Sequence, residues 1–321
     1  MKSNHRHKTL RCFFLAVSSL LLLLTTAVCG VPAAEPKPSH LVVLGDPHIS
    51  GNSKQDAKKM AAINTINSWD DVAMVIAVGD LCRQLGSDQE YETAKAFFAA
   101  LKKPFYPIAG NHDFIYDDQL DAKDRKRRAD APMRQAKLDM FQKSFGLQSS
   151  SYSIKAGGYL LVLLSPESGG HLTELSRQQL AWLQAELSRD RKTPTIVFFH
   201  APLAGTLDNY NKNANTANFI AQPAAAIHDM LSAHPQVFMW VSGHTHTSPA
   251  EPSFASSVNL YAGRITNIHN SNMNRKNVWT NSLFLYRDKV VVKTFDHDQG
   301  AWLPKLERTI MIPPLAKHAV F

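Results

Sequence analysis

Five short apolar segments in this chain each end in a residue type that binds metal ions. Each segment has the length and composition of a buried strand. In an open α/β sheet, the residues that follow the carboxyl ends of the strands line the ligand crevice, so five such endings can converge on one site. The segments are LVVLGDPH with Asp46 and His48, VAMVIAVGD with Asp80, FYPIAGNHD with Asn111 and His112, TIVFFH with His200, and VFMWVSGHTH with His244 and His246.

The order of the predicted elements favours an α/β fold with two sheets. Helical spacing over residues 54–69 and a capping box at Ser87 and Glu90 place helices between the first three strands, which favours parallel pairing. A hairpin turn at Gly157-Gly158 indicates an antiparallel part. Further strands are predicted at 258–262, 283–286, 290–295 and 309–312. We therefore predict a four-layer α-β-β-α sandwich of two mixed sheets flanked by helices, with the site at the carboxyl ends of the strands.

Residues 114–150 interrupt this alternation directly after His112 and Asp113. An insertion that leaves the carboxyl end of a strand overhangs the crevice, so this cap-like segment can shape substrate entry. Its second half contains a helix-like segment that ends near Gly146. A solvated helix face explains the basic run at 123–128 better than a substrate-facing rim does. No linker or repeat divides the rest, and we predict one domain over residues 35–321.

The first 34 residues have the pattern of a secretory signal peptide. A basic start from Lys2 to Arg11 precedes an apolar stretch over 12–28 and small residues around Ala33 and Ala34. An uncleaved membrane anchor is the alternative, because the apolar stretch is barely long enough to span a bilayer. Either alternative places the body outside the cytoplasm, secreted or periplasmic in the first case and membrane-anchored in the second.

Charge and cysteine content limit the partners and the means of stabilisation. The formal net charge of +8 includes four basic residues of the leader, and without them 31 basic residues against 27 acidic ones leave +4. This mild excess does not indicate nucleic acid as a partner. If the leader is cut after Cys29, Cys82 remains alone and cannot form an internal disulfide. We expect Cys82 to be a small buried residue behind Asp80.

The strand endings together supply donors for metal ions. Two cations a few ångströms apart in one site need a bridging anion. The endings contain imidazole, carboxylate and amide groups but no thiolate. This donor set suits two divalent or mixed-valence ions of Mn, Fe, Zn or Co, and it does not select among them.

In order and spacing, these endings resemble the five signature blocks of the calcineurin-like metallophosphoesterase superfamily. The blocks are Asp46-Pro-His48, Gly79-Asp80, Gly110-Asn111-His112-Asp113, His200 and Gly243-His244-Thr-His246, within residues 41–247. The resemblance implies that Asp80 bridges two metals. It also implies that Asp46, His48 and His246 are the other ligands of one metal, and that Asn111, His200 and His244 are the other ligands of the second.

The same resemblance places His112 beside the metals, as a general acid or a phosphate contact. Asp113 would then orient the His112 imidazole, or bond only to backbone. Many members of the superfamily carry Asp or Asn three residues after the bridging Asp, where this chain has Arg83. For Arg83 we favour a pair with a helix carboxylate over a contact with substrate.

We therefore expect an exported phosphoesterase that acts on a small phosphate ester, either as a phosphodiesterase or as a phosphomonoesterase. The layout of Tyr152-Ser-Ile, Gly157-Gly158 and the Trp182-bearing segment resembles the cyclic-nucleotide phosphodiesterase branch. The alternative is a non-catalytic metal-binding module, which would be expected to show replaced ligands. The amide-rich segments 209–218 and 267–277 read as polar loops that are placed to line a pocket. The oligomeric state stays open.

Overall fold

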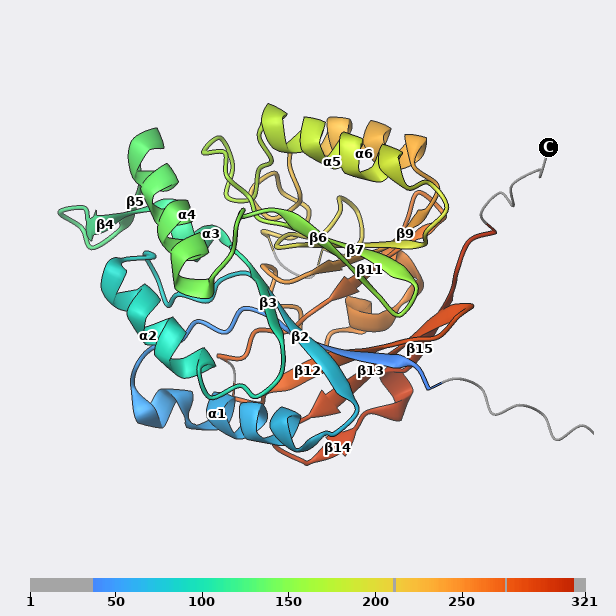
Figure 1. The fold of residues 1–321 in the computed structure, drawn as a ribbon. Coiled ribbons are helices and arrows are strands. Elements are labelled where there is room, and N and C mark those ends of the chain that lie inside the picture. Colours follow the sequence, from blue (N-terminus) through green and yellow to red (C-terminus); the bar gives the residue numbers. More distant parts are fainter. Residues whose placement is uncertain (1–36, 210–211, 275, 315–321) are drawn as a thin grey trace, which may run out of the picture. The chain divides into compact units, whose positions relative to one another are not determined.

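Two mixed β-sheets pack against each other in the part of the chain that the structure describes (Figure 1). The structure is a computed structural model that describes residues 37–209, 212–274 and 276–314. The predicted signal peptide or anchor at 1–34 lies outside these residues. Among the helices that are described, none has the length and apolarity needed to cross a membrane.

The first sheet has the strand order β14-β13-β12-β1-β2-β3, with β15 also paired to β13. β1, β2 and β3 are parallel, whereas β12 runs antiparallel to β1. The apolar segments around Asp46, Asp80 and Asn111 therefore lie side by side and end at the same edge. The bounds are β1 (Ser39–Leu44), β2 (Val72–Val78), β3 (Phe105–Ile108), β12 (Trp279–Leu285), β13 (Lys289–Asp296), β14 (Ala301–Trp302) and β15 (Arg308–Met311).

The second sheet has the order β10-β11-β9-β8-β7-β6. Its central strands are parallel, and the predicted hairpin at Gly157-Gly158 joins the antiparallel pair β6 and β7. The bounds are β6 (Tyr152–Ala156), β7 (Tyr159–Leu164), β8 (Thr195–Phe199), β9 (Val237–Ser242), β10 (Leu260–Tyr261) and β11 (Ile265–His269).

Alternation along the strands divides the apolar side chains among three layers. In β1, Leu41 and Val43 pack between the sheets, whereas Val42 and Leu44 face the opposite side. Helices α1 (Ser53–Ser68), α2 (Asp88–Phe98) and α4 (Ala131–Phe145) cover that outer face, and α5 (Arg177–Arg189) and α6 (Ala224–Ala233) cover the second sheet (Figure 1). The predicted four-layer α-β-β-α sandwich is confirmed.

Local signals set the ends of two predicted helices. The Ser87 hydroxyl accepts the backbone N–H of Glu90 at the start of α2, and the Glu90 carboxylate accepts three backbone N–H groups of residues 84–86. α4 ends where Gly146 adopts the left-handed conformation, with φ of 67°. Both helices were predicted at these positions.

The basic run at 123–128 is not a helix face, and that prediction is wrong. It belongs to a two-stranded hairpin of β4 (Tyr116–Leu120) and β5 (Lys126–Arg128). The Asp121 carboxylate accepts the backbone N–H groups of Lys123 and Arg125, and this local hydrogen bonding closes the turn.

The amide-rich segment that begins at Asn267 is not a loop along its whole length. Ile265–His269 forms β11, in which the side chains of Asn267 and His269 are fully buried. Asn267 accepts the Leu203 N–H and donates to the Ser242 hydroxyl. These partners are distant in sequence, so burial of the polar groups is compensated by hydrogen bonds that the local pattern does not show.

We expect buried His269 to make the protein sensitive to acid. Its Nε2 donates to the Thr206 carbonyl, and burial lowers the pKa of His269 to about 3. The unfolded chain binds this proton near pH 6.5. The free energy of unfolding should therefore fall as pH drops from about 6.5 towards 3, by up to about 1.4 kcal/mol per pH unit from this group.

His269→Gln keeps an N–H donor for Thr206 but cannot bind the proton. In urea unfolding at pH 6 and pH 4.5, the loss of stability between the two pH values should be smaller in His269→Gln than in the parent. His228 is exposed and serves as the control, because His228→Gln should leave the difference unchanged. Equal losses in the parent and His269→Gln would contradict the assignment.

Candidate metal centre

The carboxyl ends of five parallel strands bring the predicted site residues together. Asp46 and His48 follow β1, Asp80 follows β2, and Asn111 begins the short helix α3 (Asn111–Phe114) after β3. The second sheet contributes His200 after β8, and His244 and His246 after β9. Apart from the partly exposed His246, these seven side chains are buried.

The backbone at this site is unusual. Within the described ranges, eight non-glycine residues have positive φ, and five of them are in the predicted ligand set, namely Asp46, His48, Asp80, His244 and His246, with φ between 42° and 64°. This conformation is uncommon for such residues and costs on the order of 1–3 kcal/mol each, so it persists where the surrounding structure holds it. Its clustering at the strand ends indicates a functional site.

The acidic and histidine ligand atoms form two groups that share Asp80. One group contains Asp46, His48, Asp80 and His246, and the other contains Asp80, His200 and His244, with the atoms of each group within 4.8 Å of one another. Asp80 Oδ2 lies 3.6 Å from His48 Nε2, whereas Oδ1 lies 3.3 Å from His200 Nε2. The two oxygens thus face different groups, as a bridging carboxylate must.

Asn111 joins the second group. Its side-chain oxygen lies 3.1 Å from His200 Nε2. Backbone carbonyls bind the ring nitrogens that point away from the site: His200 Nδ1 donates to Val78 at 2.7 Å, and His244 Nε2 donates to Asn218 at 2.8 Å. These bonds set the tautomers and leave His200 Nε2 and His244 Nδ1 free to bind a metal.

The pKa values agree with a site built for cations. Burial alone would raise the pKa of Asp80 and lower that of His200, but their mutual attraction outweighs burial. It holds the pKa of Asp80 well below its usual range and raises the pKa of His200 to about 9. Burial lowers the pKa of His244 to about 4, so that imidazole is neutral. Ionised carboxylates and neutral imidazoles are the forms that bind metals, so Asp80 and His244 are already in that form, whereas His200 must release a proton to bind a cation. The donor set as a whole fits a two-metal centre.

Two glycines are required because the ligands approach the backbone closely. A Cβ atom on Gly110 would lie 2.4 Å from Asp80 Oδ1, and one on Gly243 would lie 2.3 Å from Asp46 Oδ2. Any larger residue would displace these carboxylates. This is a stricter role than the sharp turns that strand-end glycines ordinarily provide.

His112 lines the cleft beside the two groups. Its ring centroid lies 4.9 Å from that of His48, and its backbone N–H donates to Asp80 Oδ1. Burial lowers the pKa of His112 to about 3, so the imidazole is neutral without a substrate. A bound phosphate adds negative charge next to the ring and opposes this shift.

Asp113 connects two loops of the site. Its carboxylate accepts the backbone N–H groups of Leu81, Cys82 and Gly110, which corresponds to the backbone role considered for it above. Burial raises the pKa of Asp113 to about 7. Cys82 is fully buried behind Asp80, as predicted. Arg83 is exposed and takes part in no ion pair among the described residues, so the expected pair with a helix carboxylate is absent there.

Asn272 contacts a predicted ligand, and sequence reasoning did not single it out. Its carboxamide nitrogen lies 2.8 Å from His246 Nδ1, while its buried Oδ1 has no hydrogen-bond partner in the part of the chain that the structure describes. Turning the carboxamide by 180° lets Oδ1 accept the Nδ1–H. This bond directs His246 Nε2 towards the first ligand group, where it lies 3.4 Å from Asp46 Oδ1. In the sequence, the amide-rich composition of 267–277 was the only feature that pointed to a residue such as Asn272.

Replacing Asn272 should weaken metal binding without removing a ligand. We expect Asn272→Ala to lower the affinity of one metal by about 10–100-fold, because supporting partners of ligating histidines have effects of this size. Asn272→Asp should retain most of the affinity, since a carboxylate also accepts the Nδ1–H. Metal titration of the purified proteins measures this, with exposed Asn64→Ala as the control. Unchanged binding in Asn272→Ala would contradict this role.

A cavity of about 330 Å³ opens over the site. Besides ligands, its walls include Tyr116 from the 114–150 insertion, Leu172, and Phe219, whose ring stacks on His244 with centroids 4.9 Å apart. The two amide-rich segments thus differ, since residues of the first, Asn213 and Ala214, do line this pocket.

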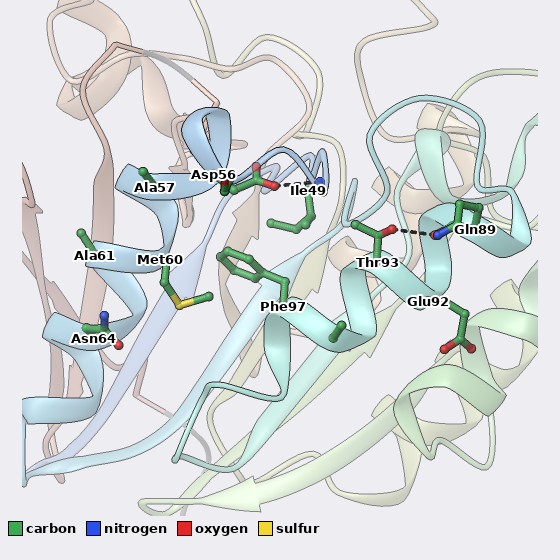
Figure 2. Close-up of a pocket in the computed structure, with 13 residues that line it drawn as sticks. Ile49, Asp56, Ala57, Met60, Ala61, Asn64, Gln89, Glu92, Thr93 and Phe97 are labelled. Atoms are coloured by element: carbon green, nitrogen blue, oxygen red, sulfur yellow. Dashed lines mark hydrogen bonds between the residues drawn. The ribbon is translucent and has the colours of Figure 1, made fainter.

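A larger cavity of about 760 Å³ lies between α1 and α2, away from these ligands. Figure 2 shows Met60 and Phe97 reaching into it from the two helices. Two acidic residues line it: Asp56 is already bound to backbone N–H groups and to Lys59, and Glu92 pairs with Lys95 at 3.9 Å. This cavity therefore offers no comparable chemistry.

Comparison with known proteins supports the same interpretation. Residues 39–248 match the sequence pattern of the calcineurin-like phosphoesterase family. A probable glycerophosphodiester phosphodiesterase of Arcobacter nitrofigilis is 25% identical over 218 residues, which cover 64% of this chain and 71% of the relative.

Two solved structures share the fold. A dimetal phosphatase from Danio rerio has a TM-score of 0.60 at 15% identity, and the match covers 87% of this chain and all of that one. The purple acid phosphatase PPD1 from yellow lupin, Lupinus luteus, has a TM-score of 0.56 at 15% identity, with 87% of this chain and 55% of that chain covered.

Proposed function

The chain belongs to the calcineurin-like phosphoesterase family, and from this we propose that it hydrolyses a small phosphate ester at two metal ions held by the seven side chains above. The observation that carries the proposal is the position of Asp80, which belongs to both ligand groups and directs one oxygen to each. A shared carboxylate is what two adjacent cations require.

Each side chain has a defined task in this proposal. Asp46, His48 and His246 hold one ion with Asp80, while Asn111, His200 and His244 hold the other. When bound, such a pair lowers the pKa of a water and neutralises the non-bridging oxygens of the ester. Mn, Fe, Zn and Co suit this donor set. His112 binds the phosphate or gives a proton to the departing oxygen.

The ester class is part of the proposal. The Arcobacter nitrofigilis relative supports a diester substrate, whereas the Danio rerio and yellow lupin structures are phosphatases. We therefore propose a phosphodiesterase or phosphomonoesterase activity. We also propose that residues 1–34 direct export, with membrane anchoring as the alternative. Fractionation of cells and the amino-terminal sequence of the mature protein distinguish the two.

Metal analysis and two chromogenic esters test the activity. The purified protein should contain up to two transition metal ions per chain and should hydrolyse 4-nitrophenyl phosphate, bis(4-nitrophenyl) phosphate, or both. A screen of mono- and diesters with each metal then identifies the substrate class. A protein that binds no metal and hydrolyses neither ester would overturn the proposal.

A further inference from the structure

The β4–β5 hairpin carries charges whose pairing alternates along β5. On one face, Arg127 pairs with Asp117 at 2.6 Å, and in the adjoining turn Arg125 pairs with Asp121 at 2.8 Å. Lys126 and Arg128 are two residues apart and so lie on the other face of the strand. Neither forms an ion pair with a described carboxylate. Aspartates thus neutralise Arg125 and Arg127, whereas no described carboxylate pairs with Lys126 or Arg128.

Lys126 and Arg128 both make contacts close to the candidate metal site. Lys126 Nζ lies 3.3 Å from His112 Nδ1, and also lies over the Tyr116 ring at 4.9 Å from its centroid. Arg128 donates to the Gly169 carbonyl at 2.7 Å and to the Asn218 side chain at 3.4 Å. Asn218 is also the residue whose carbonyl binds His244. Arg128 thus positions loops, whereas Lys126 lies beside the group that meets phosphate.

Lys126 is placed to reach a substrate. His112 and Tyr116 both line the 330 Å³ cavity, so the ammonium stands at its rim. The contact with the Tyr116 ring holds the ammonium there without neutralising it. Its four-carbon stem is flexible, and its three donors can turn towards a phosphate oxygen that binds His112. Lys126 is exposed, and its contacts with His112 and Tyr116 direct its ammonium towards the cleft.

We propose that Lys126 is a substrate-binding residue that contacts the phosphate beside His112 and favours doubly charged phosphate monoesters over singly charged diesters. This proposal rests on the proposed function. The attraction between an ammonium and a substrate grows with the charge of the substrate. A phosphate monoester carries about 1.5 to 2 negative charges at neutral pH, whereas a diester carries one. Removing Lys126 should therefore cost the monoester more.

A kinetic comparison tests this preference. For Lys126→Gln we expect kcat/KM to fall by about tenfold on 4-nitrophenyl phosphate and by about threefold or less on bis(4-nitrophenyl) phosphate, as for a charged contact that is partly solvated. Lys126→Arg should keep most of the activity. Lys123→Gln, in the turn of the same hairpin, should behave as the parent. Equal losses on both esters, or no loss, would overturn the proposal.

Binding of inorganic phosphate separates this inference from the proposed function. In calorimetric titration of the metal-loaded protein at pH 8, Lys126→Gln should raise the Kd of phosphate by about tenfold, while Lys123→Gln should not change it. If the parent protein hydrolyses esters but Lys126→Gln leaves the Kd of phosphate unchanged, the role of Lys126 is refuted and the proposed function stands. A parent protein that hydrolyses no ester would contradict the proposed function, and the phosphate titration would still decide the role of Lys126.

Discussion

Asp80→Asn is expected to lose metal and activity together. Asparagine keeps the shape of the side chain but removes the charge that both ligand groups share. Loss of a supporting residue typically lowers metal affinity by 10–100-fold, so we expect loss of this shared ligand to cost more than about 100-fold. After dialysis, elemental analysis should find fewer than one ion per chain, and hydrolysis should fall in parallel.

The control for this variant is Asp70→Asn, which replaces an exposed carboxylate just before the same strand. It should retain the metal content and activity of the parent. A thermal unfolding scan of both proteins shows whether the fold survives. An Asp80→Asn protein that folds and keeps two ions per chain would refute the bridging role.

Replacing His112 should have an effect that depends on the leaving group. If His112 protonates the departing oxygen, His112→Gln should slow alkyl phosphate esters by about 10²–10⁴-fold, because a basic alkoxide needs the proton. Nitrophenyl esters have good leaving groups and should be slowed much less. The measurement is kcat/KM for one alkyl and one nitrophenyl ester of the same charge.

The outcome separates the two roles considered for His112. Equal losses on both esters would mean that His112 binds phosphate and does not act as the acid. Metal content should be unchanged, because His112 lies beside the ligand groups and is not a member of either. A matched control is His228→Gln, which replaces an exposed imidazole on α6.

The fold was predictable because apolar periodicity and strand-end residues report on local structure. The segments before Asp46, Asp80 and His200 are continuous apolar runs, and each forms a buried strand of the predicted sandwich. The ends of these strands lie close together because neighbouring strands of a parallel sheet end at the same edge. Family resemblance then supplied the division of ligands, and the structure brings those side chains together in two groups that share Asp80.

What was missed depends on contacts between distant residues. Asn272 reaches His246, 26 positions earlier, and nothing in its neighbourhood indicates that partner. Asn267 lies in a strand although its amide favours loops, because Ser242 and Leu203 satisfy its hydrogen bonds. The hairpin containing Lys126 was misread as a helix, since a run of charged residues shows no apolar period from which to identify a strand.

The ligand groups also connect the two sheets. Each group takes residues from both layers: His246 of the second sheet joins Asp46 and His48 of the first, and His200 and His244 join Asp80. Metal ions bound here would therefore cross-link the two sheets across their apolar interface. A ligand that binds only the folded chain adds about 2.7 kcal/mol at a hundredfold excess over its Kd. Metal binding should thus stabilise the packing of the two sheets as well as supply the chemistry.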